Sequence, residues 1–312
     1  MEIKSSVAIA SYNGSDYIQE QLQSIYEQTV QVEEVIICDD GSSDDTCEIV
    51  KRFIEQKGLS DSWKLVVNDN NLGYADNFHK AMMLCSGEYI FVCDQDDVWE
   101  PDKVEAMLGV MQKDNGVKLL CSDFTPLVSS SDAPSIKREV SRSMRNDGSV
   151  EQYHLNKRTM YLSRLGCLMC VRRSFLHEAD KFWYSGWAHD EYLWRTALCF
   201  DGLYILHRRL VKRRLHSSNV SMRPKHKIDV RIKYLQDLLK SDENILRCAI
   251  SNNMNEMAIS RIKKNIRAAQ LRLDLVKDHK ISNMLRLVFY LDCYHSKRAY
   301  ITEPLIMIKN SK

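Results

Sequence analysis

The hydrophobic positions of the first hundred residues alternate between short apolar runs and stretches with helical spacing. Four apolar runs predict buried strands, at residues 7–10, 35–38, 64–67 and 89–93. Between the runs, apolar residues recur every three or four positions, as Ile18, Leu22 and Ile25 do, and predict helices. Strands that alternate with helices form βαβ units with right-handed crossovers. We therefore expect an α/β fold with a mainly parallel central sheet flanked by helices.

A polar cluster follows each predicted strand, at residues 11–14, 39–45, 68–73 and 94–97. Ligands bind at the carboxyl ends of strands in open α/β sheets, so we expect the clusters to share one edge. The carboxylates Asp94, Asp96 and Asp97 come directly after an apolar strand and cannot be core residues, because buried unpaired charge is too costly. Carboxylates at this position suit a hard divalent cation that keeps sites free for substrate phosphates. An acidic surface turn is the alternative.

Composition narrows the class of protein. The chain has 312 residues, of which 44% are apolar and 28% charged, which is typical of a globular protein. No apolar run is long enough to span a bilayer, and the N-terminus lacks the shape of a signal peptide, so we expect a cytoplasmic protein whose ten cysteines are thiols. The apolar surroundings of Cys167 and Cys170 favour a strand over a metal or redox site. Neither G-x-G-x-x-G nor G-x-x-x-x-G-K-[ST] occurs, so a nucleotide must be held in another way.

The charge is distributed unevenly along the chain. Residues 225–312 hold 18 Lys and Arg against 9 Asp and Glu, a net charge of +9, whereas residues 1–224 hold 26 against 33, a net charge of −7. We expect a catalytic domain over 1–224, with a polar loop at 129–150, and a basic, mainly helical region over 225–312. Basic residues around apolar helical stripes suit an anionic membrane surface, and we expect no nucleic-acid partner. A helical cap on the domain and a dimer interface are the alternatives.

Six short motifs follow one another between about residues 5 and 220: Ala10-Ser11-Tyr12-Asn13, Asp39-Asp40-Gly41-Ser42, Asn68-x-x-Asn71-x-Gly73-x-x-x-Asn77, Asp94-Gln95-Asp96-Asp97-Val98-Trp99, His189-Asp190-Glu191 and Arg214-x-His216-x-x-Asn219. In this order they make the chain resemble a family 2 glycosyltransferase with the GT-A fold. The fourth motif, with Pro101-Asp102-Lys103 after it, is similar to that of bacterial rhamnosyltransferase-like members that build surface polysaccharide. The resemblance implies a nucleotide-diphospho-sugar donor.

The resemblance assigns a nucleotide-binding role to the first three motifs and part of the fourth. Tyr12 would stack on the base, and Asp40 would accept the N3–H of uracil or thymine. The remaining nucleotide contacts would come from Ala10, Asn13, Asn71, Gly73, Asn77, Asp94 and Gln95. We expect a positive φ at Gly73. As alternatives, Tyr12 would pack on the core, Asp39 or Asp40 would cap the next helix, with Asp39 favoured, and Asn77 would bond to the backbone.

The resemblance also implies a metal site and an acceptor side. Asp96, Asp94 and His216 would hold Mn²⁺ or Mg²⁺ with the donor diphosphate, with Asp97 orienting the loop. Contacts to diphosphate or acceptor would come from Arg214, Trp99, Trp187 and Glu191, and the segment 166–170 would line the acceptor side. The alternative for both tryptophans is a place in the core, and for His216 a structural role.

Asp190 matches the position where the family places its catalytic base. It would take the proton of the acceptor hydroxyl in an inverting transfer, with Glu191 as the fallback base. Family members often carry Glu-Asp here, and His189 stands in place of the Glu. The alternative is a solvated turn before a helix at 192–198, with Asp190 favoured by the helix dipole.

The expected function is that of a metal-dependent inverting glycosyltransferase. It would move a sugar from a UDP- or dTDP-sugar to a hydroxyl of a glycan, linked to polyprenyl diphosphate, in O-antigen, capsule or lipopolysaccharide biosynthesis. It would act as a peripheral protein on the inner face of the cytoplasmic membrane. The wording near Asp94 favours rhamnose, with glucose, galactose and their N-acetyl forms left open. A non-catalytic nucleotide-sugar binding module is the alternative from another functional class. A receiver-type signalling domain is excluded, because the chain is too long and the Asp-x-Asp does not fit it.

Overall fold

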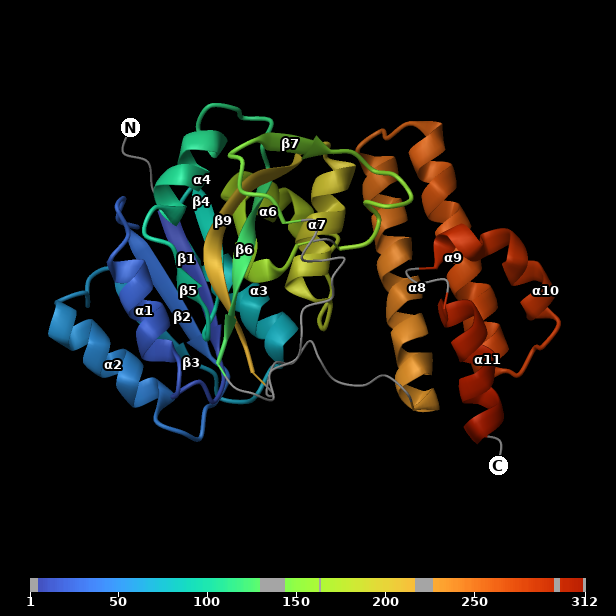
Figure 1. Cartoon of the computed structure of the whole chain (residues 1–312), viewed down its shortest axis with the longest axis horizontal. Coiled ribbons are helices and arrows are strands. Elements are labelled where there is room, and N and C mark those ends of the chain that lie inside the picture. The colour runs from blue at the N-terminus through green and yellow to red at the C-terminus, as the bar shows by residue number, and fades with distance from the viewer. Residues whose placement is uncertain (1–4, 130–143, 163, 217–226, 295–297, 311–312) are drawn as a thin grey trace. The chain divides into compact units, whose positions relative to one another are not determined.

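The computed structural model describes residues 5–129, 144–162, 164–216, 227–294 and 298–310 (Figure 1). The chain forms two compact units. The first consists of residues 1–153 and 162–219, and the second of residues 154–161 and 220–312. The sequence placed a division at residue 224 and gave no sign that the segment 154–161 belongs with the C-terminal residues.

The first unit contains a nine-stranded sheet with the order β3-β2-β1-β4-β8-β6-β9-β5, in which β7 pairs with β9. The strands β1, β2, β3 and β4 lie at the four predicted positions and pair in parallel. β6 and β9 also pair in parallel, whereas β8, β5 and β7 join antiparallel to their neighbours. The sheet is thus mixed and mostly parallel, with β1 Ser5–Ser11, β2 Glu34–Asp39, β3 Trp63–Val67, β4 Tyr89–Asp94, β5 Val98–Trp99, β6 Leu119–Val128, β7 Val150–Tyr153, β8 Met169–Arg172 and β9 Leu203–Leu215.

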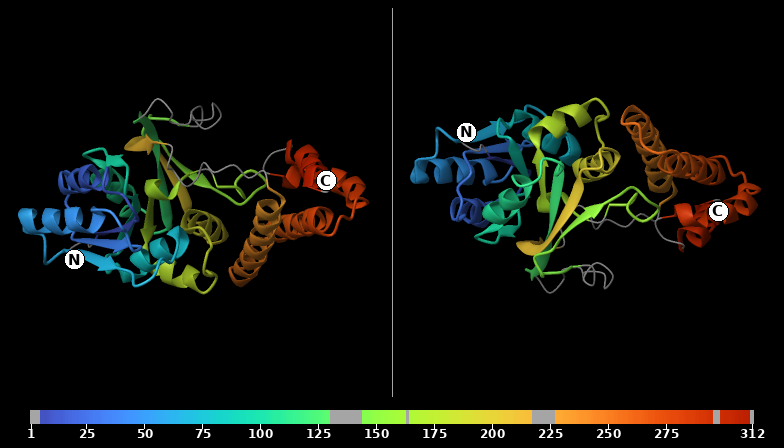
Figure 2. Two further views of the ribbon diagram at one scale, coloured as in Figure 1. Left: turned by 90° about the horizontal axis from the view of Figure 1, so that it is seen from below. Right: turned by 90° about the horizontal axis from the view of Figure 1, so that it is seen from above.

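Helices cover both faces of this sheet (Figure 2). The chain steps outward from β1 to β2 to β3 and then returns to β4 on the other side of β1. Because crossovers are right-handed, this reversal puts α1 and α2 on one face and α3 on the other. The predicted apolar side of α1 is fully buried at Ile18, Leu22 and Ile25. The helices are α1 Ile18–Tyr26, α2 Thr46–Lys57, α3 Tyr74–Leu84, α4 Lys103–Met111, η1 Gly166–Leu168, α6 Arg173–Asp180 and α7 His189–Cys199.

The C-terminal part of the second unit is mainly helical over its described residues, as predicted, with α8 Ile228–Ser251, α9 Glu256–Lys277, α10 Asn283–Leu287, η3 Val288–Cys293 and α11 Arg298–Asn310. The carboxylate of Glu303 on α11 is buried between Arg231 of α8 and Arg272 of α9, which joins three helices through one ionic cluster. The hydroxyl of Tyr161 donates to the carbonyl of Cys293 and attaches the segment 154–161 to this unit. Among the described helices, none combines the length and the apolar character that a membrane span requires.

Candidate active site

The parallel register brings the predicted polar clusters to one edge of the sheet. Ala10 of β1 pairs with Asp94 of β4, and Ser11 pairs with Asp39 of β2. The strands therefore end at the same level, and the loops that follow them meet there. The predicted convergence of the first, second and fourth clusters is confirmed, and its physical basis is the alignment of the strand ends.

Tyr12 presents its ring to solvent while its backbone is held in place. The side chain of Gln95 accepts a hydrogen bond from the Tyr12 N–H at 2.8 Å and donates to the Tyr12 carbonyl at 3.0 Å. A Cβ at Gly14 would lie 2.3 Å from the Gln95 amide, so only glycine leaves room for this arrangement. Tyr12 is 51% exposed, so its flat apolar ring is available to stack on a base.

Asn13 completes the loop after β1. It has a φ of +48°, its N–H donates to Ser42, and its side-chain oxygen accepts from the N–H of Ser43. Asp39 accepts bonds from Ser11 and Ser42 and is buried. The alternative in which Asp39 caps α2 is wrong, because Asp45 occupies the N-cap position.

Asp40 organises the loop after β3. One oxygen accepts from Asn68 at 2.9 Å and from the Leu72 N–H at 2.7 Å, and the other accepts from the Gly73 N–H at 2.8 Å. Gly73 has a φ of +82°, which confirms the predicted positive value. Asn71 reinforces the loop by donating to the Asp40 carbonyl. The carboxylate thus holds the loop 68–73 against the end of β2.

Asn77 is buried on α3, and both ends of its amide bond within the protein. Its oxygen accepts from Asn68 at 2.9 Å, and its nitrogen donates to the carbonyl of Cys38 at 2.8 Å. These bonds tie α3 to the end of β2. The alternative of a helix residue bonded to backbone therefore describes the contacts of Asn77 in this structure.

The loop after β4 forms an acidic cluster. Ligand atoms of Asp94, Asp97 and Cys167 all lie within 4.8 Å of one another. The Asp96 carboxylate contacts Nε2 of His216 at 2.7 Å. Asp97 accepts the backbone N–H of Arg214 with one oxygen, and its other oxygen is buried without a hydrogen-bond partner among the described residues. Sequence reasoning missed the place of Cys167, because only the packing of η1 brings it to this cluster.

The acidic cluster carries more negative charge than its protein surroundings stabilise. Burial and the charges of Asp97 and Asp96 raise the pKa of Asp94 well above its ordinary value, and burial and Asp96 raise the pKa of Asp97 to about 6. Burial also raises the pKa of Cys167, which therefore stays a neutral thiol. Carboxylate oxygens with one imidazole fit Mn²⁺ or Mg²⁺, so the residues present suit the implied cation.

The side chain of Arg214 stabilises the loop that carries the acidic cluster. Its guanidinium donates to the Asp96 carbonyl at 2.8 Å and to Glu20 at 2.5 Å, and lies over the ring of Tyr17. These contacts, with the backbone bond to Asp97, fix the loop. The observed contacts of Arg214 are thus those of a residue that positions the acidic cluster.

Trp99 and Lys103 support the same region from the core. Trp99 is 2% exposed, and the ammonium of Lys103 lies 3.7 Å from the centroid of its ring. Lys103 is fully buried, donates to the carbonyl of Cys167 at 2.9 Å, and has its pKa lowered to about 8 by burial. The core-anchor alternative describes Trp99, since so little of its ring is available to a sugar. Lys103 is part of a motif in the sequence, but the motif predicted no role for it.

Asp190 lies in the first turn of α7, which begins at His189 and not at residue 192 as predicted. One oxygen of Asp190 accepts the N–H of Glu191 at 2.8 Å. Burial raises the pKa of Asp190 to about 6, and the charge of Glu191 adds to the increase. Asp190 in turn contributes to the raised pKa of Asp94. Glu191 pairs with Arg195 at 3.0 Å.

His189 is buried beside Asp190 and is neutral. Its ring packs on Phe78 with centroids 3.8 Å apart, and burial lowers its pKa to about 3. Neither ring nitrogen has a hydrogen-bond partner among the described residues. Trp187 is also buried, between Tyr184 and Tyr192, so the core alternative describes this tryptophan as well.

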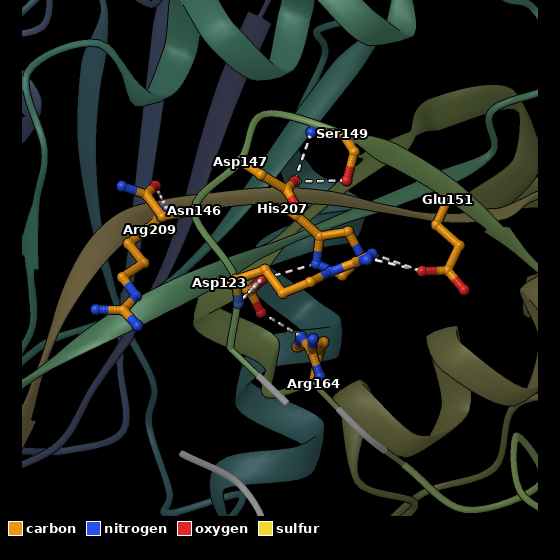
Figure 3. A network of polar contacts seen from close by, with 9 residues as sticks. Asp123, Asn146, Asp147, Ser149, Glu151, Arg164, His207 and Arg209 are labelled. Atoms are coloured by element: carbon orange, nitrogen blue, oxygen red, sulfur yellow. Dashed lines mark hydrogen bonds and ion pairs between the residues drawn. The ribbon is translucent and has the colours of Figure 1, made fainter. Parts of the chain in front are cut away.

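A buried charged network lies on β6 and β9 (Figure 3). Asp123 contacts Arg164 at 2.8 Å and Nδ1 of His207 at 2.9 Å, and all three are buried. Nε2 of His207 reaches Glu151 of β7 at 3.2 Å. No local pattern in the sequence indicates this network, because its members come from four separate segments.

A mixed α/β sheet whose aligned strand ends carry acidic residues is the arrangement of the GT-A fold. The chain belongs to the family described as Glycosyl transferase family 2, which matches residues 6–174. It is 40% identical over 118 residues to chondroitin synthase of Escherichia coli, covering 35% of this chain and 15% of that protein. It is 33% identical over 110 residues to the E. coli UDP-Glc:alpha-D-GlcNAc-diphosphoundecaprenol beta-1,3-glucosyltransferase WfgD, covering 35% and 42%. The chain therefore matches less than half the length of these two relatives.

Solved structures show the same fold. S. aureus TarS in complex with UDP-GlcNAc aligns with a TM-score of 0.63 and 15% identity over 99% of this chain and 92% of that chain. The mannosyltransferase PcManGT from Pyrobaculum calidifontis, in complex with GDP-Man and Mn²⁺, aligns with a TM-score of 0.54 and 19% identity, covering 99% and 86%. The predicted GT-A fold is confirmed by these likenesses.

Proposed function

We propose that the protein is a metal-dependent inverting glycosyltransferase that uses a UDP- or dTDP-sugar donor. The observation that carries the proposal is the contact between His189, the neighbour of Asp190, and Gly166 of η1, the segment that brings Cys167 to the acidic cluster at the end of β4. The raised pKa of Asp190 supports the same role. Membership of Glycosyl transferase family 2 supports the reaction class.

The loops after β1 and β3 form the proposed nucleotide side. The exposed ring of Tyr12, held by Gln95, offers a stacking surface to the base. Asp40 and the loop 68–73 would lie along its edge, and an acceptor there favours uracil or thymine over cytosine. A named relative uses UDP-Glc, which supports a pyrimidine donor. The motif wording at Asp94–Trp99 keeps rhamnose from dTDP-rhamnose among the candidates.

The acidic cluster forms the proposed cation site. Asp96, Asp94 and His216 would hold Mn²⁺ or Mg²⁺, with Asp97 beside them, and a bound cation would stabilise the charge that develops on the departing nucleoside diphosphate. Arg214 and Lys103 keep the cluster in shape, since one holds the loop and the other holds the Cys167 segment. The Mn²⁺ named with the neighbour PcManGT supports the choice of ion.

Asp190 is the proposed base. A pKa of about 6 leaves the carboxylate ionised at neutral pH and yet basic enough to assist the removal of a hydroxyl proton. The proton passes from the acceptor hydroxyl to Asp190 while the acceptor oxygen forms its bond to the sugar and the diphosphate departs. Glu191 is less suited to this role, because it pairs with Arg195.

The proposed acceptor is a glycan linked to a polyprenyl diphosphate, in the assembly of O-antigen, capsule or lipopolysaccharide. The diphosphoundecaprenol acceptor named for WfgD supports this class. Such acceptors lie in the cytoplasmic membrane, so the enzyme would act peripherally on its inner face. The net charge of +9 over residues 225–312 supports contact with an anionic surface.

The release of nucleoside diphosphate from a panel of UDP- and dTDP-sugars, with Mn²⁺ and with EDTA, tests the proposal. We expect release from one donor, and only when metal is present. Release should be faster when a lipid-diphosphate-linked glycan is added. Release that continues in EDTA would contradict the metal requirement. No release with any donor and acceptor, together with donor binding by calorimetry, would instead favour a nucleotide-sugar binding module.

A further inference from the structure

The second unit exposes a row of large apolar side chains along α10 and η3. Ile281 is 63% exposed, and Leu285 and Phe289 are each 79% exposed. They follow one another at intervals of four residues, and Val288 beside them is 47% exposed. Leu285, Val288 and Phe289 lie three and four residues apart in consecutive helical turns and share one outer face, and Ile281 lies in the turn before α10. We call this set of four residues the apolar face.

The segment that carries the apolar face is fixed to the unit by its other side. Leu287 is fully buried and packs with Leu271 and Leu275 of α9, and Met284 is partly buried against the same cluster. The hydroxyl of Tyr300 donates to the Met284 carbonyl at 3.1 Å. The inner side of α10 therefore already has its core contacts, and the apolar face is a separate outward feature of a folded segment.

Basic residues flank the apolar face. Lys277, Lys280 and Arg286 are all exposed. The nearby carboxylates have cationic partners, since Lys280 lies 3.4 Å from Asp274 and 3.7 Å from Asp278, and Asp292 pairs with Lys264 at 3.0 Å and with a neighbouring arginine. The region 225–312 as a whole has 18 cationic against 9 anionic side chains. The surroundings of the apolar face therefore favour a negatively charged partner.

We infer that the apolar face of α10 and η3 inserts into the interfacial layer of an anionic lipid bilayer. Leu and Phe on one side, with Lys and Arg around them, is the composition of an interfacial helix. A second copy of this chain would bring a second region of charge +9 to the same place, and such like charges repel. The inference deepens the proposed use of a lipid-linked acceptor, which would bring the enzyme to the surface where that acceptor lies.

Vesicle flotation of the full-length protein tests the inference. We compare vesicles of phosphatidylcholine that contain phosphatidylglycerol with vesicles of phosphatidylcholine alone. The double variant Leu285→Ser/Phe289→Ser should lower the partition coefficient for anionic vesicles by at least about tenfold. Met257→Ser is the matched control, because Met257 is 80% exposed but lies in the first turn of α9, and it should bind as the wild type does.

A spectroscopic measurement checks insertion directly. Trp introduced by Phe289→Trp should be quenched by brominated lipid, whereas Trp introduced by Met257→Trp should not. Unchanged flotation of the double variant, or failure of the wild type to bind anionic vesicles, would overturn the inference. So would a wild-type dimer that the double variant dissociates, since the apolar face would then contact a second copy.

Donor hydrolysis measured on the same proteins without vesicles separates the two proposals. The double variant should release nucleoside diphosphate at the wild-type rate, because its substitutions lie outside the candidate active site. A wild type that floats with anionic vesicles but releases no nucleoside diphosphate with any donor and acceptor would leave the membrane inference intact and contradict the proposed function alone.

Discussion

The imidazole of His189 occupies the space in which a side chain at position 166 would begin. A Cβ at Gly166 would lie 2.0 Å from Nε2 of His189. Gly166 starts the η1 segment that carries Cys167 to the acidic cluster, and His189 precedes Asp190. The contact thus connects the segment that carries Cys167 with the segment that carries Asp190.

Gly166→Ala should damage both stability and transfer. The added methyl group must displace His189 or η1, and overpacking of this kind costs about 1–3 kcal/mol of unfolding free energy. Chemical denaturation and steady-state kinetics measure the two effects. Gly109→Ala is the matched control, because a Cβ there meets nothing within 4 Å, and it should leave both unchanged or slightly raise stability. His189→Ala combined with Gly166→Ala should recover part of the lost stability, and no recovery would show that the clash lies elsewhere.

Asp190→Asn should abolish transfer and keep donor binding. The loss of a general base lowers kcat by roughly 10²–10⁴-fold, and calorimetry should show an unchanged Kd for the donor. Glu191→Gln is the companion variant and should retain most of the activity. If Glu191→Gln instead removed the activity and Asp190→Asn did not, Glu191 would be the base.

The pH profile of transfer should follow the ionisation of Asp190. The active form is the carboxylate, so the rate should rise with pH through about 6 and level off above it. Protonation below that value should lower the rate by about tenfold for each pH unit, as for one titrating group. A profile that is flat between pH 5 and 7, measured as kcat/KM with saturating metal, would contradict the assignment.

Asp96→Ala and His216→Ala should weaken metal binding. Each removes one proposed ligand, and the Mn²⁺ concentration for half-maximal donor hydrolysis should rise by at least about tenfold. Asp69→Ala removes an exposed carboxylate from a neighbouring loop and is the matched control. An unchanged Mn²⁺ titration for both ligand variants would place the metal elsewhere.

Tyr12→Ala should raise the KM for the donor, whereas Tyr12→Phe should not. Base stacking on an aromatic ring contributes about 1–3 kcal/mol, so the alanine variant should bind the donor roughly 5- to 150-fold more weakly. The phenylalanine variant keeps the flat ring and separates stacking from any role of the hydroxyl. Equal donor affinities of the two variants, measured by calorimetry, would refute stacking by Tyr12.

Asp123→Asn should destabilise the fold more than it affects the chemistry. It leaves Arg164 and His207 buried without their shared carboxylate, and breaking a buried ion pair costs about 3–5 kcal/mol. Asp147→Asn, at an exposed position in the adjoining loop, is the control and should stay within about 0.5 kcal/mol of the wild type. A normal denaturation midpoint for Asp123→Asn would show that the network contributes little to stability.

Much of the first unit could be predicted, because the sequence patterns that indicate its strands and loops are local. The apolar runs that became β1 to β4 depend on near neighbours in the sequence, and parallel strands must place their following loops at one edge. The positive φ of Gly73 could be predicted for the same reason, because the turn that requires it is formed by only a few neighbouring residues. Helical spacing also indicated that the region after 225 is helical.

The remaining features depend on contacts between segments that are distant in the chain. Composition does not tell whether an aromatic ring such as Trp99 faces a sugar or the core, since packing against Lys103 decides it. The proximity of Cys167 to Asp94 likewise arises from the position of η1. The sequence by itself determined the order of the elements and the loops that carry the chemistry. Tertiary structure alone decided which side chains meet in those loops, because register and packing set the distances between residues that local patterns cannot relate.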